Sequence, residues 1–102
     1  MINYDNLVNY LKVNALGKSN PITSRVICNY FGCSSADLRR NVNLARNNGY
    51  GICSSVKGYY YATNKADINE TINQLRGRIA KIKEAISGLE EGACVWNSEP
   101  TL

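Results

Sequence analysis

The chain has 102 residues, a length that supports one modest hydrophobic core. Hydrophobic residues make up 44% of the sequence and charged residues 20%, which is typical of a globular protein and excludes a disordered one. No apolar stretch approaches the roughly 20 residues that span a bilayer. The first residues also lack the basic and apolar regions of a signal peptide. We therefore expect a cytoplasmic protein with no membrane partner.

The formal net charge of +4 is unevenly distributed along the chain. Residues 1–63 contain seven Lys/Arg and two acidic residues, whereas residues 64–102 contain five Lys/Arg and six acidic residues. A localised positive field attracts polyanions, while a mixed surface does not. A nucleic-acid partner is therefore expected to bind the first part of the chain.

The residues that usually carry catalysis or bind metals are scarce. The sequence has no histidine, no Gly-rich phosphate loop and no nucleophile–base pair, so an enzyme is not expected. The cysteines at positions 28, 33, 53 and 94 lack the CxxC spacing of a zinc site. We expect the first three to be small buried hydrophobic residues, and we predict neither a metal nor another cofactor.

Three short helices are expected in the first 50 residues. Apolar side chains recur at helical spacing over residues 4–16. They recur again in a shorter run that Thr23 or Ser24 caps and Gly32 ends. A proline-containing break separates these two helices and leaves room for at most a stub of strand at residues 22–23.

The third expected helix begins at a capping box. Ser34 and Asp37 lie three residues apart, so the hydroxyl and the carboxylate can accept hydrogen bonds from N–H groups that the first turn leaves unpaired. Leu38, Val42 and Ala45 follow at helical spacing and are expected to line the inward face.

Two extended runs, residues 52–55 and 59–62, are expected to form a β-hairpin around a turn that ends in glycine. Side chains alternate between the two faces of a strand. We expect Tyr59 and Tyr61 on the core face and Tyr60 on the outer face.

A long helix is expected over residues 64–91, followed by a tail at 92–102. Its apolar residues are spaced alternately four and three apart, the pattern of a coiled-coil seam: Ile68, Ile72, Leu75, Ile79, Ile82, Ile86 and Leu89. We expect this stripe to pair two copies of the chain; the alternative is a stripe that folds back on the first helix. A parallel dimer would place Arg78 against the partner's Lys83, so an antiparallel pair and higher oligomers stay open. Trp96 in the tail is expected to dock on the helix end or to serve as a short partner motif.

Several short motifs occur in the order of these elements: GCS at 32–34, LRRNV at 38–42, ARNNGY at 45–50 and GYYYA at 58–62. Together they resemble the winged helix-turn-helix domains of the type found at the N-terminus of the biotin-operon repressor. The resemblance covers residues 22–62. Small prophage-encoded winged-helix proteins of Gram-positive bacteria resemble the chain more loosely, over more of its length.

The resemblance implies a mainly α fold with a small β-hairpin: a winged helix-turn-helix over residues 1–63, followed by the heptad helix. It also implies that the third helix enters the major groove of DNA. With Leu38 and Val42 inward, the outward residues of this helix are Ser35, Arg39, Arg40, Asn43 and Asn47. Arginine can bind guanine through two hydrogen bonds and asparagine can bind adenine likewise. Lys57 and Tyr60 of the hairpin are expected to contact phosphates.

The sequence departs from the family in two places. Ala45 stands where the family usually has leucine, so the third helix should lie closer to the core or be held less firmly. The expected wing is short and holds a single cation, Lys57, so it should not reach deeply into a groove.

Two functions fit these observations. The first is binding of double-stranded DNA by a dimeric transcriptional regulator or a phage or plasmid accessory factor. The alternative is a protein-interaction module on a winged-helix scaffold, such as a phage protein that binds or inhibits a host or defence protein. The short wing, the tyrosine-rich hairpin and Trp96 motivate this alternative.

Overall fold

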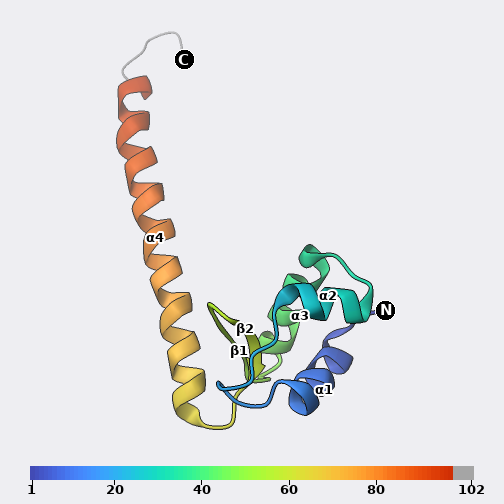
Figure 1. The fold of residues 1–102 in the computed structure, drawn as a ribbon. Helices are drawn as coiled ribbons and strands as arrows, with labels where there is room; N and C mark the ends of the chain where they lie inside the picture. Colours follow the sequence, from blue (N-terminus) through green and yellow to red (C-terminus); the bar gives the residue numbers. More distant parts are fainter. Residues whose placement is uncertain (98–102) are drawn as a thin grey trace. The chain divides into compact units, whose positions relative to one another are not determined.

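A computed structural model describes residues 1–97 of the chain. The protein is mainly helical, with one small antiparallel hairpin and a long C-terminal helix, as the sequence predicts. Its elements in chain order are α1 (Tyr4–Asn14), α2 (Ser24–Phe31), α3 (Ser35–Asn47), β1 (Ile52–Ser55), β2 (Gly58–Tyr61) and α4 (Lys65–Asn97) (Figure 1). None of the helices within residues 1–97 combines the length and apolarity that crossing a membrane requires.

The chain divides into two compact units, residues 1–71 and the residues from 72 onward. The first unit holds α1, α2, α3, the hairpin and the first turns of α4. The second unit holds the rest of α4.

The starts of α2 and α3 follow from their capping residues. Thr23, rather than Ser24, caps α2, because its hydroxyl accepts a hydrogen bond from the Val26 N–H at 3.4 Å. At α3 the expected capping box is present: the Ser34 hydroxyl accepts from the Asp37 N–H at 3.1 Å, and the Asp37 carboxylate accepts from the Ser34 N–H at 3.4 Å. Three residues therefore separate α2 from α3.

The core of the first unit lies between α1, α2, α3 and the hairpin. α3 packs against both α1 and α2, and α1 also packs against β2. Leu38, Val42 and Ala45 of α3 face inward as predicted. The buried apolar residues are Leu7, Val8, Leu11, Ala15, Ile27, Leu38, Val42, Ala45, Ile52, Cys53 and Tyr60.

The segment between α1 and α2 pairs with the outer edge of the hairpin. Ile22 exchanges two backbone hydrogen bonds with Tyr59, each 2.8 Å, and the Gly17 N–H donates to the Tyr61 carbonyl at 2.8 Å. The stub of strand expected at residues 22–23 is therefore a β-bridge to β2. This pairing places the chain that enters α2 directly beside the hairpin.

Tyr59 and Tyr61 pack against the core as expected, but the prediction that Tyr60 faces solvent is wrong. Tyr60 is only 1% exposed, whereas Tyr59 and Tyr61 are half-buried. Tyr60 pairs with Cys53 in the hairpin, and the Cys53 thiol donates to the carbonyl of Asp67 in the first turn of α4, at 3.5 Å. The start of α4 therefore covers the hairpin face that was expected to meet solvent. Burial on this face raises the pKa of Tyr60 and the pKa of Cys53.

The long helix begins as expected and ends later than expected. The Asn64 side-chain oxygen accepts from the Asp67 N–H at 2.9 Å, and the Asp67 carboxylate accepts from the Thr63 N–H at 3.2 Å. The helix continues to Asn97, so the tail expected from residue 92 is helical as far as residue 97. The remainder of the expected tail, residues 98–102, lies outside the described residues.

Candidate nucleic-acid interface

The outward face of α3 carries the five residues that the sequence placed there. Burial of the opposite face fixes the rotation of the helix, because side chains three and four residues apart share a face. All five are exposed, namely Ser35, Arg39, Arg40, Asn43 and Asn47, and the apolar Ala36 and Leu44 of α3 are exposed as well. This α3 face therefore presents two guanidinium groups, two amides and a hydroxyl, all of which can donate hydrogen bonds.

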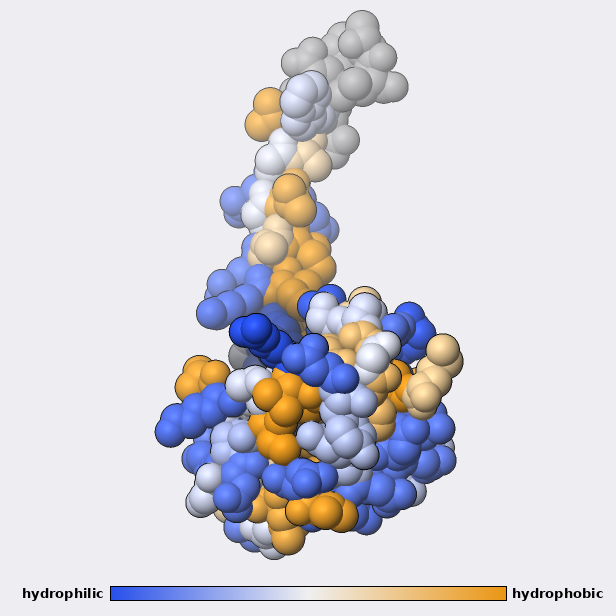
Figure 2. Space-filling view, turned by 45° about the vertical axis from the view of Figure 1, so that its right-hand side comes forward, coloured by the Kyte–Doolittle hydropathy of each residue, from blue (hydrophilic) through white to orange (hydrophobic). Residues whose placement is uncertain are grey.

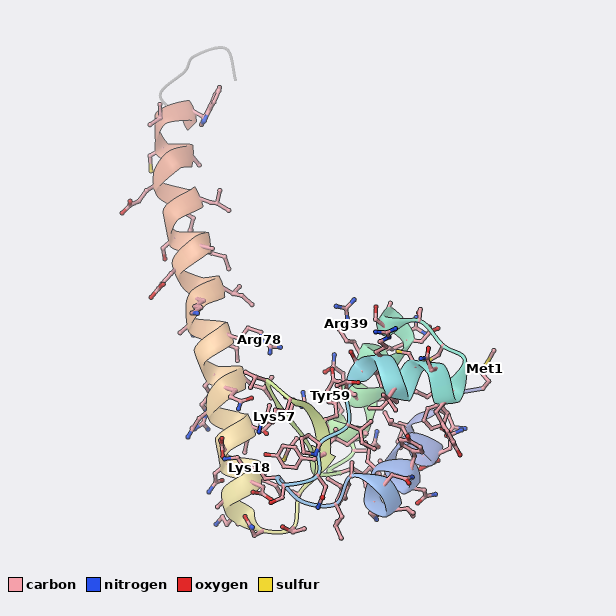
Figure 3. All side chains as sticks on the ribbon, viewed as in Figure 1. Met1, Lys18, Arg39, Lys57, Tyr59 and Arg78 are labelled. Carbon is pink, nitrogen blue, oxygen red and sulfur yellow. The ribbon has the colours of Figure 1, made fainter. Side chains whose placement is uncertain are left out.

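The two arginines of the α3 face differ in their contacts. The side chain of Arg39 makes no hydrogen bond or ion pair with any residue between 1 and 97. Figure 3 shows this side chain extending away from α3. Arg40 forms an exposed ion pair with Asp37, with 3.3 Å between Nη2 and Oδ1. Exposed pairs of this kind contribute about 0–1 kcal/mol, so an incoming phosphate or base can displace Asp37 from Arg40.

Two side chains of α3 make partly buried hydrogen bonds, one within the helix and one to the hairpin. The Asn41 side chain is buried and donates to the Asp37 carbonyl at 2.8 Å, within the helix. Arg46 turns toward the hairpin, where its Nε donates to the Ile52 carbonyl at 2.8 Å and its Nη2 to the Ser54 hydroxyl at 3.4 Å. Arg46 therefore fixes α3 relative to β1 instead of joining the α3 face.

Replacing Arg46 by alanine is expected to lower the free energy of unfolding by about 1–3 kcal/mol, because the partly buried Ile52 carbonyl loses its charged donor. Thermal unfolding followed by circular dichroism measures this loss. Asn47→Ala, an exposed substitution one residue along the same helix, serves as the control and should change stability by less than about 0.5 kcal/mol. Equal stability of the two variants would contradict the structural role of Arg46.

The hairpin turn contributes one further cation to the interface. Lys57 is exposed at the turn and lies beside a shallow depression of about 270 Å³. The depression is lined by Thr23 and Ser24 at the start of α2 and by residues 55–59. Tyr60, expected to bind phosphates here, is buried and cannot do so. The position of Ser24 beside the hairpin turn was not predicted, because it depends on the long-range pairing of Ile22 with β2.

Two other cations of the first unit, Lys12 and Lys18, are engaged within the fold. The Lys18 ammonium lies 2.8 Å from a carboxylate oxygen of Glu70, and this hydrogen bond and the charge of Glu70 raise the pKa of Lys18. Lys12 lies over the rings of Tyr61 and Tyr50, 5.2 and 5.9 Å from their centroids. The positive charge available to a polyanion therefore comes from the α3 face, Lys57, Arg25 of α2 and Lys65 at the start of α4, all of which are exposed.

The second unit exposes the apolar seam of α4, visible as orange side chains on the helix in Figure 2. Ile79, Ile82 and Ile86 are each about half exposed, and Leu89 is 74% exposed. Because α4 runs beyond residue 91, Ala93 and Trp96 continue the spacing of four and three. Ile68, in the first unit, lies close to Gly51 but is still 39% exposed, about as much as Ile72.

Comparisons with protein-family models, with curated proteins and with solved structures find no match to this chain. Among the described residues no three Cys, Asp or Glu side chains lie close enough together to hold a metal ion. Cys53 is buried, as expected, and Cys28 and Cys33 are half-buried. The surface features that could bind a partner are the α3 face, the hairpin turn and the α4 seam.

Proposed function

We propose that the chain binds double-stranded DNA as a winged helix-turn-helix protein, with α3 in the major groove. The observation that carries this proposal is the α3 face, where Arg39 stands exposed without a partner between residues 1 and 97. Arg40, Asn43 and Asn47 lie exposed on the same helix. Side chains of these types bind the edges of guanine and adenine in the major groove.

The order and spacing of the elements support the same proposal. α2, a three-residue turn and α3 form a helix-turn-helix, in which the second helix is the one that reads DNA. The hairpin that follows α3 acts as a short wing. Lys57 on this wing and Ser24 at the start of α2 are placed to bind phosphates, which orient the domain without reading sequence.

A single copy has few available cations and would bind DNA weakly, because each phosphate that it neutralises adds only a limited amount to the binding free energy. Pairing through the α4 seam raises affinity by presenting two α3 faces to one DNA molecule. We therefore propose a homodimer that acts as a transcriptional regulator or as a phage or plasmid accessory factor in the cytoplasm.

Titration of the purified chain against random-sequence duplex DNA, at several salt concentrations, tests the proposal. We expect binding that weakens with salt, with a slope of about −0.9 in log K against log[salt] for each phosphate contacted. A slope near zero, or no binding at about 50 mM salt, would contradict DNA binding.

Disrupting the seam tests whether pairing of two copies strengthens DNA binding. Ile82→Asp places a charge in the centre of the seam and is expected to make the chain monomeric in sedimentation equilibrium, because an unpaired carboxylate is costly to bury. Ser87→Asp adds the same charge to α4 away from the seam and serves as the control. The Ile82→Asp variant should also bind DNA at least roughly tenfold more weakly than the control. A dimer that survives Ile82→Asp would contradict pairing through this seam.

Binding to another protein is the second candidate function, and one surface of the first unit favours it. Tyr30 of α2 is 66% exposed and Val26, one turn earlier, is 50% exposed. The Tyr30 ring stacks on Tyr10 of α1, with 4.4 Å between centroids, so the two helices share an aromatic surface. A stoichiometric partner that is captured after nuclease treatment and lost in Tyr30→Ala would favour this function over DNA binding.

A further inference from the structure

The second unit has a strong charge polarity along α4. Residues 72–83 contain four cations, Arg76, Arg78, Lys81 and Lys83, and no acidic residue. Residues 84–97 contain three acidic residues, Glu84, Glu90 and Glu91, and no cation. One helix therefore carries a positive half followed by a negative half.

The helix dipole does not explain this polarity. Its influence is confined to the first and last turns of a helix. Glu90 and Glu91 lie seven and six residues before Asn97, so they are more than one turn from the end of α4. The stability of the single helix does not account for this arrangement, whereas a partner helix running in the opposite direction does.

An antiparallel alignment also matches the apolar residues of the two copies. When the helices cross level with Glu84, Ile82 lies opposite the partner's Ile86 and Ile79 opposite the partner's Leu89. The same register pairs Leu75 with the partner's Ala93 and Ile72 with the partner's Trp96. Every seam residue between 72 and 97 thereby has a counterpart, and no residue of the first unit is required.

The charges away from the crossing point agree with this register, whereas Lys83, which flanks the same edge, meets the partner's Lys83 near the centre. Glu90 of one copy lies level with Arg78 of the other copy. It is two residues, or about 3 Å of helix rise, from the level of that copy's Arg76. Arg76 and Glu90 each follow a seam residue directly, so both flank the same edge of an antiparallel interface. A parallel alignment instead places like-charged halves together and sets Arg78 against the partner's Lys83.

We propose that two copies of the chain pair their α4 helices antiparallel over residues 72–97, centred on Glu84, with each positive half on the partner's negative half. This inference rests on the proposed pairing through the seam and specifies its direction and register. Trp96 then belongs to the interface, opposite the partner's Ile72. The exposed Trp96 of the single chain becomes buried on association.

Charge reversal in the full-length chain tests the direction of pairing. Arg76→Glu should weaken the dimer roughly tenfold in sedimentation equilibrium, since two attractive pairs become repulsive. Glu90→Arg should weaken it by a similar factor, and the chain carrying both substitutions should return to within about threefold of the original affinity. Unchanged association in Arg76→Glu, or no recovery in the double variant, would overturn the antiparallel register.

Disulfide cross-linking supplies an independent readout that does not depend on DNA. Ile79→Cys and Leu89→Cys chains, each also carrying Cys94→Ser, are mixed and oxidised with glutathione disulfide. Antiparallel pairing should link residue 79 of one copy to residue 89 of the other, as identified by mass spectrometry. Links of 79 to 79 and 89 to 89, or a monomer in sedimentation, would overturn the proposal. A gel shift on the same samples measures DNA binding independently, so failure of the pairing and failure of DNA binding can be told apart.

Discussion

Replacing both Arg39 and Arg40 by alanine is expected to weaken DNA binding of the full-length chain by about a hundredfold or more. Each arginine on the α3 face can make a bidentate contact with guanine, and such contacts are worth about 1–3 kcal/mol each. Both side chains are exposed and neither is needed for the core, so the variant should fold normally. Fluorescence anisotropy with a labelled duplex measures the loss.

The matched control removes two cations elsewhere. Lys12 on α1 and Lys65 on α4 are exposed, away from α3 in the sequence, and their replacement by alanine lowers the net charge by the same amount. This control should lose no more than about tenfold in affinity, as expected for a change in general electrostatic attraction. If the two double variants weaken binding equally, affinity reflects net charge and α3 does not contact the bases.

Replacing Gly58 by alanine is expected to have the largest effect on stability, a loss of about 3 kcal/mol or more. Gly58 has a φ of +137°, and a Cβ here would collide with the carbonyl oxygen of Ile22 and lie 2.9 Å from the Thr23 nitrogen. Both neighbours are backbone atoms held by the pairing of Ile22 with Tyr59, so they cannot move cheaply. For a domain of this size the melting temperature should fall by roughly 12 °C or more.

Two other glycines provide controls for this substitution. Gly49 also has a positive φ, +87°, but a Cβ would have nothing within 4 Å, so Gly49→Ala should cost only about 1 kcal/mol. Gly77 lies in α4 with open space around it, and Gly77→Ala should stabilise the helix by about 1 kcal/mol. Similar melting temperatures for the Gly58 and Gly49 variants would show that β2 does not pair with Ile22.

Local signals in the sequence predicted the helices well. The hydroxyl of Ser34 and the carboxylate of Asp37 act within one turn, so the start of α3 could be located from four residues. The inward face of α3 followed from the spacing of Leu38, Val42 and Ala45, and this placed Arg39 on the outside. The exposed members of the α3 face could therefore be named from the amino-acid pattern alone.

Long-range contacts were not predictable in the same way. Tyr60 was assigned to solvent because alternation gives two faces but does not say what covers each one. The start of α4 covers the second face, and this contact depends on how the chain turns back after β2. The helix end was missed for a different reason: Gly88 and Gly92 suggest an end near residue 91, yet α4 continues to Asn97.

The proposed role of α3 is to read base pairs in duplex DNA. Repeated selection of bound duplexes from a random-sequence library, followed by sequencing, shows whether it does. We expect the original chain to enrich a short motif containing guanine, and Arg39→Ala to lose the preference at one of its positions. A library that stays random after selection, or a motif unchanged by Arg39→Ala, would contradict the claim.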